Sequence, residues 1–116
     1  MSKSIQEPRD LIGERISAVC FVWDYVEIRF DGTILRSLSN PIVRVRGELF
    51  RYPDSGSRDA LCQLVGTTVR GLTIDEGRAL ELSTDNDCNL TIPLASADGD
   101  ETMHFLPGPN QPLSVW

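Results

Sequence analysis

The side chains best suited to metal chemistry are those of Asp85, Asp87 and Asn89, which alternate along the chain. This spacing opens a calcium-binding loop, in which alternate oxygen ligands converge on one cation. Such a loop also needs glycine at its sixth position and a bidentate glutamate at its twelfth. Here those positions hold Leu90 and Ser96. The pattern therefore favours a polar hairpin turn, and we expect no metal site.

Hydrolytic chemistry has little support in the sequence. His104 is the only histidine, and no serine lies in a Gly-x-Ser-x-Gly elbow. Asp31 and Asp85 occupy matching positions, as two catalytic carboxylates would, but aspartate is favoured in hairpin turns by backbone preference alone. The chain has no glycine-rich phosphate loop, and Lys3 is its only lysine. We therefore expect a non-enzymatic protein without a cofactor.

The cysteines are widely separated and form no Cys-x-x-Cys pair of the kind that binds zinc or cycles redox equivalents. Cys20 lies in an apolar segment, and Cys62 lies beside Leu61. For these two and Cys88 we expect reduced thiols that belong mainly to the core.

Acidic side chains are concentrated in one stretch of the chain. The formal net charge is −6, and the stretch from Asp75 to Glu101 contains eight acids but only one base, Arg78. Segregated negative charge disfavours nucleic-acid binding, which needs clustered Lys and Arg, and favours association with a basic protein. The alternative is that this charge only keeps the protein soluble. The candidate partner-binding residues are Asp75, Glu76, Asp85, Asp87, Asp98, Asp100 and Glu101.

Two smaller groups of side chains are also suited to partner contacts. Guanidinium groups recognise carboxylates, and exposed aromatic residues often anchor interfaces. The alternatives are a solvated strand face for the first group and packing in the core or in turns for the second. The groups are Arg44, Arg46 and Arg51, and Trp23, Tyr25 and Trp116.

The elements that position these residues are encoded twice. Leu11-Ile12-Gly13-x-x-Ile16-x-x-Val19-x-Phe21 recurs 53 residues later as Leu64-Val65-Gly66-x-x-Val69-x-x-Leu72-x-Ile74. The correspondence continues from Val26-x-Ile28-x-Phe30 to Leu80-x-Leu82-x-Thr84. We infer an internal duplication of residues 11–38 and 64–94, within a single domain that spans residues 1–116.

Each repeat predicts a meander of three antiparallel strands, because its apolar residues are β-branched or alternate with polar ones. Asp31-Gly32 predicts a type I′ turn that sets Ile28 opposite Leu35. A three-residue loop at 85–87 sets Leu82 opposite Leu90 in the same way. The predicted strands are 16–22, 26–30 and 33–38 in the first repeat, and 69–74, 79–84 and 88–94 in the second.

Ser57 is predicted to cap a helix over residues 58–65, which Gly66 ends in the left-handed region. Gly13 precedes the first meander in the same way, so we expect a positive φ at both glycines. Residues 43–52 predict an extra strand or hairpin, and the segments after Leu94 predict short edge strands. The expected fold is mainly β, at the margin of α+β, with two similar antiparallel three-stranded meanders sharing one core, extra edge strands and one short helix.

The duplicated pattern L-[IV]-G-x-x-[IV]-x-x-[VL]-x-[FI], the Phe30-Asp31-Gly32 turn and the terminal Val115-Trp116 resemble a family of small bacterial proteins of unknown function. The resemblance covers nearly the whole chain and rests on structural glycines and core positions. It implies a duplicated β fold and carries over no catalytic residue. The second hairpin departs from the pattern, with Ser83-Thr84-Asp85-Asn86 at its turn. In its size, acidity and duplicated strands, the chain also resembles, more weakly, some immunity proteins that neutralise bacterial toxins.

The sequence thus predicts a protein-binding domain, with an immunity protein that covers a basic toxin as the specific hypothesis. One alternative is a structural or accessory subunit that forms a homodimer through an edge strand, and another is an uncharacterised enzyme. No apolar run approaches the roughly 20 residues that cross a bilayer. The first residues lack the apolar segment of a secretory signal, so we expect a cytoplasmic protein with no membrane or nucleic-acid partner.

Overall fold

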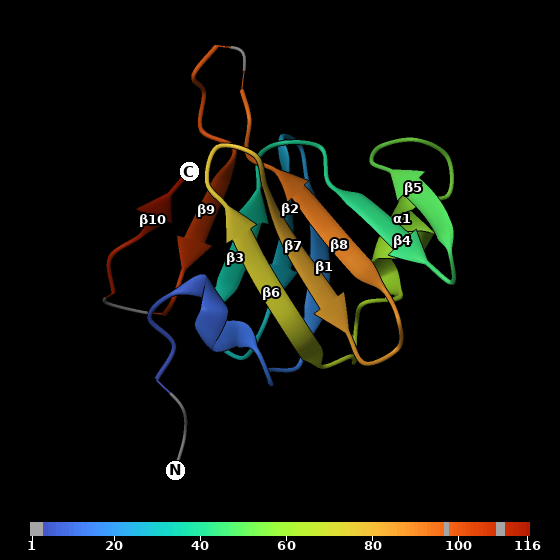
Figure 1. Cartoon of the computed structure of the whole chain (residues 1–116), viewed down its shortest axis with the longest axis horizontal. Coiled ribbons are helices and arrows are strands. Elements are labelled where there is room, and N and C mark those ends of the chain that lie inside the picture. Colours follow the sequence, from blue (N-terminus) through green and yellow to red (C-terminus); the bar gives the residue numbers. More distant parts are fainter. Residues whose placement is uncertain (1–3, 97, 109–110) are drawn as a thin grey trace.

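The computed structural model describes residues 4–96, 98–108 and 111–116, which form two antiparallel five-stranded sheets (Figure 1). The sheets confirm the mainly β fold, with similar meanders formed by β1-β2-β3 and β6-β7-β8. In spatial order, sheet 1 contains β1 (Ala18–Val22), β2 (Tyr25–Arg29), β3 (Ile34–Ser37), β9 (Met103–Leu106) and β10 (Ser114–Val115). Sheet 2 contains β5 (Glu48–Arg51), β4 (Ile42–Val45), β8 (Asn89–Pro93), β7 (Ala79–Thr84) and β6 (Val69–Asp75).

The two sheets exchange strands. The hairpin β4-β5 follows the first meander in the chain but pairs with β8 of the second meander. Reciprocally, β9-β10 follows the second meander and pairs with β3 of the first. In Figure 1 the green hairpin therefore lies beside orange β8, and the red strands lie beside teal β3. Neither sheet is complete without strands from both halves of the chain.

The starts of the two repeats are joined by reciprocal backbone hydrogen bonds. Gly13 N donates to Val69 O and Gly66 N donates to Ile16 O, both at 2.8 Å. The two bonds are equivalent under the repeat, because Gly66 and Val69 lie 53 residues after Gly13 and Ile16. This is the pattern of an isologous two-fold interface, contained here within one chain. The isolated bridge at its centre joins Arg15 to Thr68.

Alternation along the strands puts apolar side chains of both sheets into one core. The predicted registers are confirmed, with Ile28 opposite Leu35 and Leu82 opposite Leu90. All four of these side chains are at most 1% exposed. Because one-residue slips would turn them outward, burial fixes the register of both meanders.

The turn at Asp31-Gly32 is not the predicted type I′, since Gly32 has a positive φ (83°) and Asp31 does not. Asp31 thereby avoids the steric cost that the left-handed region imposes on residues with a Cβ atom. The type I′ geometry occurs instead at Arg46-Gly47, where both φ angles are positive, at 52° and 82°. These two residues connect β4 to β5.

In the described part of the chain, two short helices flank the sheets, namely the 3₁₀ helix η1 (Pro8–Leu11) and α1 (Ser57–Cys62). The predicted cap of α1 is wrong, because Ser57 is already helical and buried, and the N-cap is Gly56 with φ of 85°. The predicted end is also late, since α1 stops at Cys62. No helix among the described residues is long and apolar enough to cross a bilayer.

The expectation that Cys62 belongs to the core is wrong. Leu61 is fully buried, but Cys62 is exposed. One residue along an α-helix turns the side chain by about 100°, which takes Cys62 off the buried face of α1. Cys88 is buried and Cys20 is half-buried.

Replacing either repeated glycine should destabilise the protein through its backbone. Gly13 and Gly66 have φ of 92° and 86°, as expected from the sequence, and a Cβ at either would meet no atom within 4 Å. Gly13→Ala and Gly66→Ala should each cost roughly 1–2 kcal/mol in the free energy of unfolding, measured by urea titration. Gly108→Ala is the matched control, because its Cβ would make ordinary contacts and its φ is not positive. Equal free energies of unfolding for all three variants would contradict a requirement for glycine at the positive φ of Gly13 and Gly66.

Candidate functional site

Glu27 is the most deeply buried charged residue in the described part of the chain, with 3% of its surface exposed. It lies on the outer face of β2, between Val26 and Ile28, which point into the core. A buried carboxylate is costly unless it is paired and hydrogen-bonded. Its surroundings therefore define the polar site of sheet 1.

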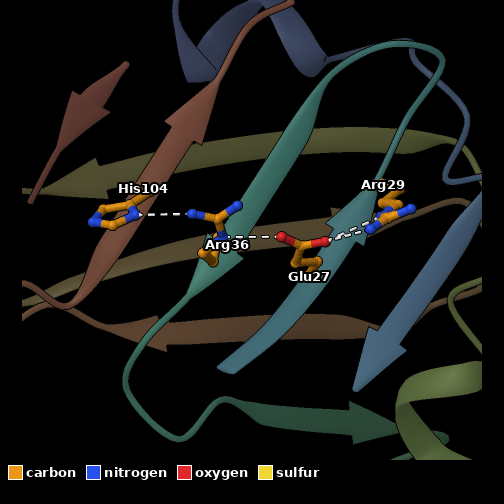
Figure 2. A network of polar contacts seen from close by, with 4 residues as sticks. All are labelled: Glu27, Arg29, Arg36 and His104. Atoms are coloured by element: carbon orange, nitrogen blue, oxygen red, sulfur yellow. Dashed lines mark hydrogen bonds and ion pairs between the residues drawn. The ribbon is translucent and has the colours of Figure 1, made fainter. Parts of the chain in front are cut away.

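Two arginines bind both oxygens of the Glu27 carboxylate (Figure 2). Arg29, two residues along β2, donates from Nη2 to Oε1 at 2.7 Å and from Nε to the same oxygen at 3.1 Å. Arg36, directly opposite on β3, donates from Nε to Oε2 at 2.9 Å. The side chain of Glu27 is thus enclosed by its own ion pairs.

Burial raises the pKa of Glu27, but hydrogen bonds from Arg29 and Arg36, together with their positive charges, outweigh burial and lower this pKa below its usual value. The hydrogen bond to Glu27 in turn raises the pKa of Arg29. Glu27 is therefore held as the carboxylate. It accepts hydrogen bonds and is unsuited to act as a general acid.

The polar site continues across the sheet to His104 on β9 (Figure 2). Arg36 Nη1 lies 3.3 Å from His104 Nδ1, and His104 Nε2 lies 3.0 Å from Glu101 Oε2. Arginine has donors only, so Nδ1 accepts and the proton of neutral His104 lies on Nε2, which donates to Glu101. The Arg36 guanidinium also lies 4.8 Å from the ring centre of Tyr25. The site links β2, β3 and β9 electrostatically.

Of the residues in this site, only His104 is a candidate from the sequence motifs, whereas Glu27, Arg29 and Arg36 are not. The alternation Val26-Glu27-Ile28-Arg29 placed the two charged residues on one face of a strand. The cross-strand register, which was predicted correctly, also implied that Arg36 faces Glu27. Together, the alternation along β2 and the register between β2 and β3 predict that Glu27, Arg29 and Arg36 lie on one face of the sheet.

The seven candidate acids separate into two groups. Asp75 and Glu76 lie at the turn between β6 and β7, and the connection from β8 to β9 starts at the same end, because Ala79 pairs with Pro93. Asp85 and Asp87 lie in the turn at the opposite end of β7. We define the acidic end as Asp75, Glu76, Asp98, Asp100 and Glu101.

Trp116 lies within the acidic end. Its indole Nε1 donates to Glu76 Oε1 at 3.3 Å, and Thr102 N donates to its carbonyl oxygen at 2.6 Å. Asp75 forms an exposed ion pair with Arg78 at 3.4 Å. The last residue thereby connects the two acidic segments.

Asp85 and Asp87 have local roles in their turn. Asp85 Oδ1 accepts a hydrogen bond from Thr68 N at 3.2 Å. Asp87 has a φ of 62°, which aspartate tolerates better than most residues. Turn geometry thus accounts for both residues.

The other candidate groups are dispersed. Arg44 and Arg51 are exposed on sheet 2, whereas Arg46 lies in the β4–β5 turn. Trp23, in the turn between β1 and β2, is 96% exposed. Tyr25 lies against Arg36, and Trp116 packs partly against the core.

No group of three or more His, Cys, Asp or Glu residues in the described ranges is arranged to hold a metal ion. No family model matches the sequence, and comparisons with curated proteins and with solved structures give no significant match. Functional inference for this chain therefore depends on its own side-chain geometry.

Removing Arg36 should destabilise the protein far more than removing an exposed arginine. Arg36→Ala leaves one oxygen of buried Glu27 without its partner, which should cost about 1–3 kcal/mol in the free energy of unfolding. Arg78→Ala is the matched control, because the side chains of Arg78 and Asp75 are 83% and 63% exposed, and exposed pairs contribute roughly 0–1 kcal/mol. Similar urea midpoints for the two variants would refute a stabilising role for the site.

The contribution of Glu27 should disappear in acid. Its folded pKa lies below the ordinary value of 4.5, so its stabilisation is fully present above that value and is lost as the pH falls through the folded pKa. The stability difference between wild type and Glu27→Gln, from urea titrations at pH 7 to pH 3, should be constant near neutrality and shrink below about pH 4.5. A difference that stays constant throughout would rule out this linkage.

Proposed function

We propose that this chain is a non-enzymatic protein-binding domain whose acidic end binds a basic partner. One observation carries the proposal: the fold gathers five of the seven candidate acids, from two separate connections, at one end of the molecule. Asp98 and Asp100 are exposed there, so they are free to steer a positively charged surface into contact.

The specific form of the proposal is an immunity protein that covers a basic toxin. It rests on the acidic end together with the weak resemblance noted from size, acidity and duplication. In this form the partner should inhibit growth when it is expressed alone, and co-expression of this chain should restore growth.

A second candidate function is self-assembly through an edge strand. The observation in its favour is β5, which lies at the edge of sheet 2 with Glu48, Leu49 and Arg51 exposed. Exposed strand edges can pair across a two-fold axis. A doubled mass in solution would favour this candidate.

Charge reversal at the acidic end should slow association with the partner and leave folding intact. A photo-crosslinker at position 98 would first capture the partner in the source cells, and the purified pair would then be studied by stopped-flow kinetics. Asp98→Lys/Asp100→Lys should lower the association rate by about tenfold or more at low salt, and the difference should narrow as salt rises. Thermal unfolding should be nearly unchanged, because both residues are exposed loop positions.

Glu48→Lys/Asp59→Lys is the matched control, with the same change in net charge at exposed positions outside the acidic end. Its association rate should stay within about twofold of wild type. The proposal fails if both double variants slow association equally, if the captured partner is acidic, or if no partner is captured.

A further inference from the structure

The duplication gives Glu27 a counterpart on sheet 2. Glu81 lies 54 residues later, at the same position in the second meander, and it faces Thr91 on β8 as Glu27 faces Arg36 on β3. Ser83 corresponds to Arg29 in the same way. The glutamate is thus present in both repeats, whereas both arginines are present only in the first.

The surroundings of the two glutamates differ accordingly. Glu27 is 3% exposed beneath two guanidinium groups, whereas Glu81 is exposed on the outer face of β7. Within the described ranges, no ion pair or side-chain hydrogen bond reaches the Glu81 carboxylate. Sheet 2 therefore has the acceptor of the polar site without its donors.

A hollow of about 260 Å³ lies beside Glu81 on the outer face of sheet 2. This volume is several times the roughly 30 Å³ that one water occupies in the liquid. One part of the lining is polar and another is apolar, as a long side chain with a charged head requires. The lining residues are Ile42, Arg44, Leu49, Glu81, Asn89 and Thr91.

We propose that this hollow binds an arginine side chain of a partner protein, with its guanidinium on Glu81. Sheet 1 provides the internal template, since Glu27 accepts two hydrogen bonds from Arg29 and one from Arg36. The aliphatic stem of the incoming arginine would contact Ile42 and Leu49. Arginine fits better than lysine, because its planar fork donates two parallel hydrogen bonds to a carboxylate.

Two arginines of the chain itself lie near this site, but both have other partners. Arg44, in the lining of the hollow, donates from Nη1 to Gly47 O at 3.3 Å. Arg78 lines a neighbouring hollow with Glu81 and is paired with Asp75. The Glu81 carboxylate thus remains available to a guanidinium from outside.

The site can be tested with an acetylated and amidated peptide of sequence Gly-Gly-Arg-Gly-Gly, followed by NMR on the full chain. We expect saturable shifts at the amides of Asn89 and Thr91 and at the Glu81 side-chain carboxyl carbon. Glu81→Gln should weaken binding by about two- to fivefold, because solvent screens an ion pair on an exposed carboxylate. Glu48→Gln, on exposed β5 of the same sheet, should leave it unchanged. Peptides with citrulline or lysine in place of arginine should bind more weakly.

A second variant introduces into sheet 2 the two arginines that pair with Glu27 in sheet 1. Ser83→Arg/Thr91→Arg should abolish peptide binding while the protein stays folded, because the new guanidinium groups would occupy Glu81. Equal binding of the arginine and citrulline peptides, unchanged binding to Glu81→Gln, or peptide binding by this second variant would overturn the proposal.

The site is independent of the acidic end. Asp98→Lys/Asp100→Lys should retain peptide binding at Glu81 even where it slows association with the partner. Loss of peptide shifts at Asn89 and Thr91 in that variant would contradict a separate arginine site.

Discussion

The structure depends on the pairing of each half of the chain with the other. Reciprocal hydrogen bonds of Gly13 and Gly66 join the starts of the repeats, and the exchanged strands β4 and β9 complete the opposite sheets. Without that exchange, β3 and β8 would each present an open edge, which is a liability in isolated sheets. The two similar meanders therefore share one core, and each sheet is completed by strands from the other half of the chain.

The two repeats keep their inner faces alike and differ on their outer faces. Ile28 and Leu82 fill equivalent core positions, where any change of volume disturbs packing. Arg36 and Thr91 also occupy equivalent positions, but on outer faces where packing sets few limits. The outer face of sheet 1 carries a closed ionic network around Glu27. On the other outer face, Glu81 is exposed beside a hollow and lacks the two arginines of the first repeat.

The connections differ between repeats as well. The connection from β3 to β4 covers residues 38–41, whereas the one from β8 to β9 covers residues 94–102 and carries three of the acids of the acidic end. Loops tolerate such length differences because they lie outside the core. Trp116 links this longer connection to the β6–β7 turn, because it accepts a hydrogen bond from Thr102 N and donates one to Glu76.

Alternation and turn residues were sufficient to predict the meanders, the facing pairs Ile28–Leu35 and Leu82–Leu90, and the positive φ of Gly13 and Gly66. These features depend on neighbours close in sequence, so a local pattern contains them. Tertiary structure alone decided the strand exchange, the burial of Glu27 and the separation of Asp85 and Asp87 from the acidic end. Alternation tells which side of a strand is buried, but it does not tell which distant strand lies beside it. Partner choice between β3 and β9, or between β4 and β8, is set by packing of the whole core, and that information has no local period in the sequence.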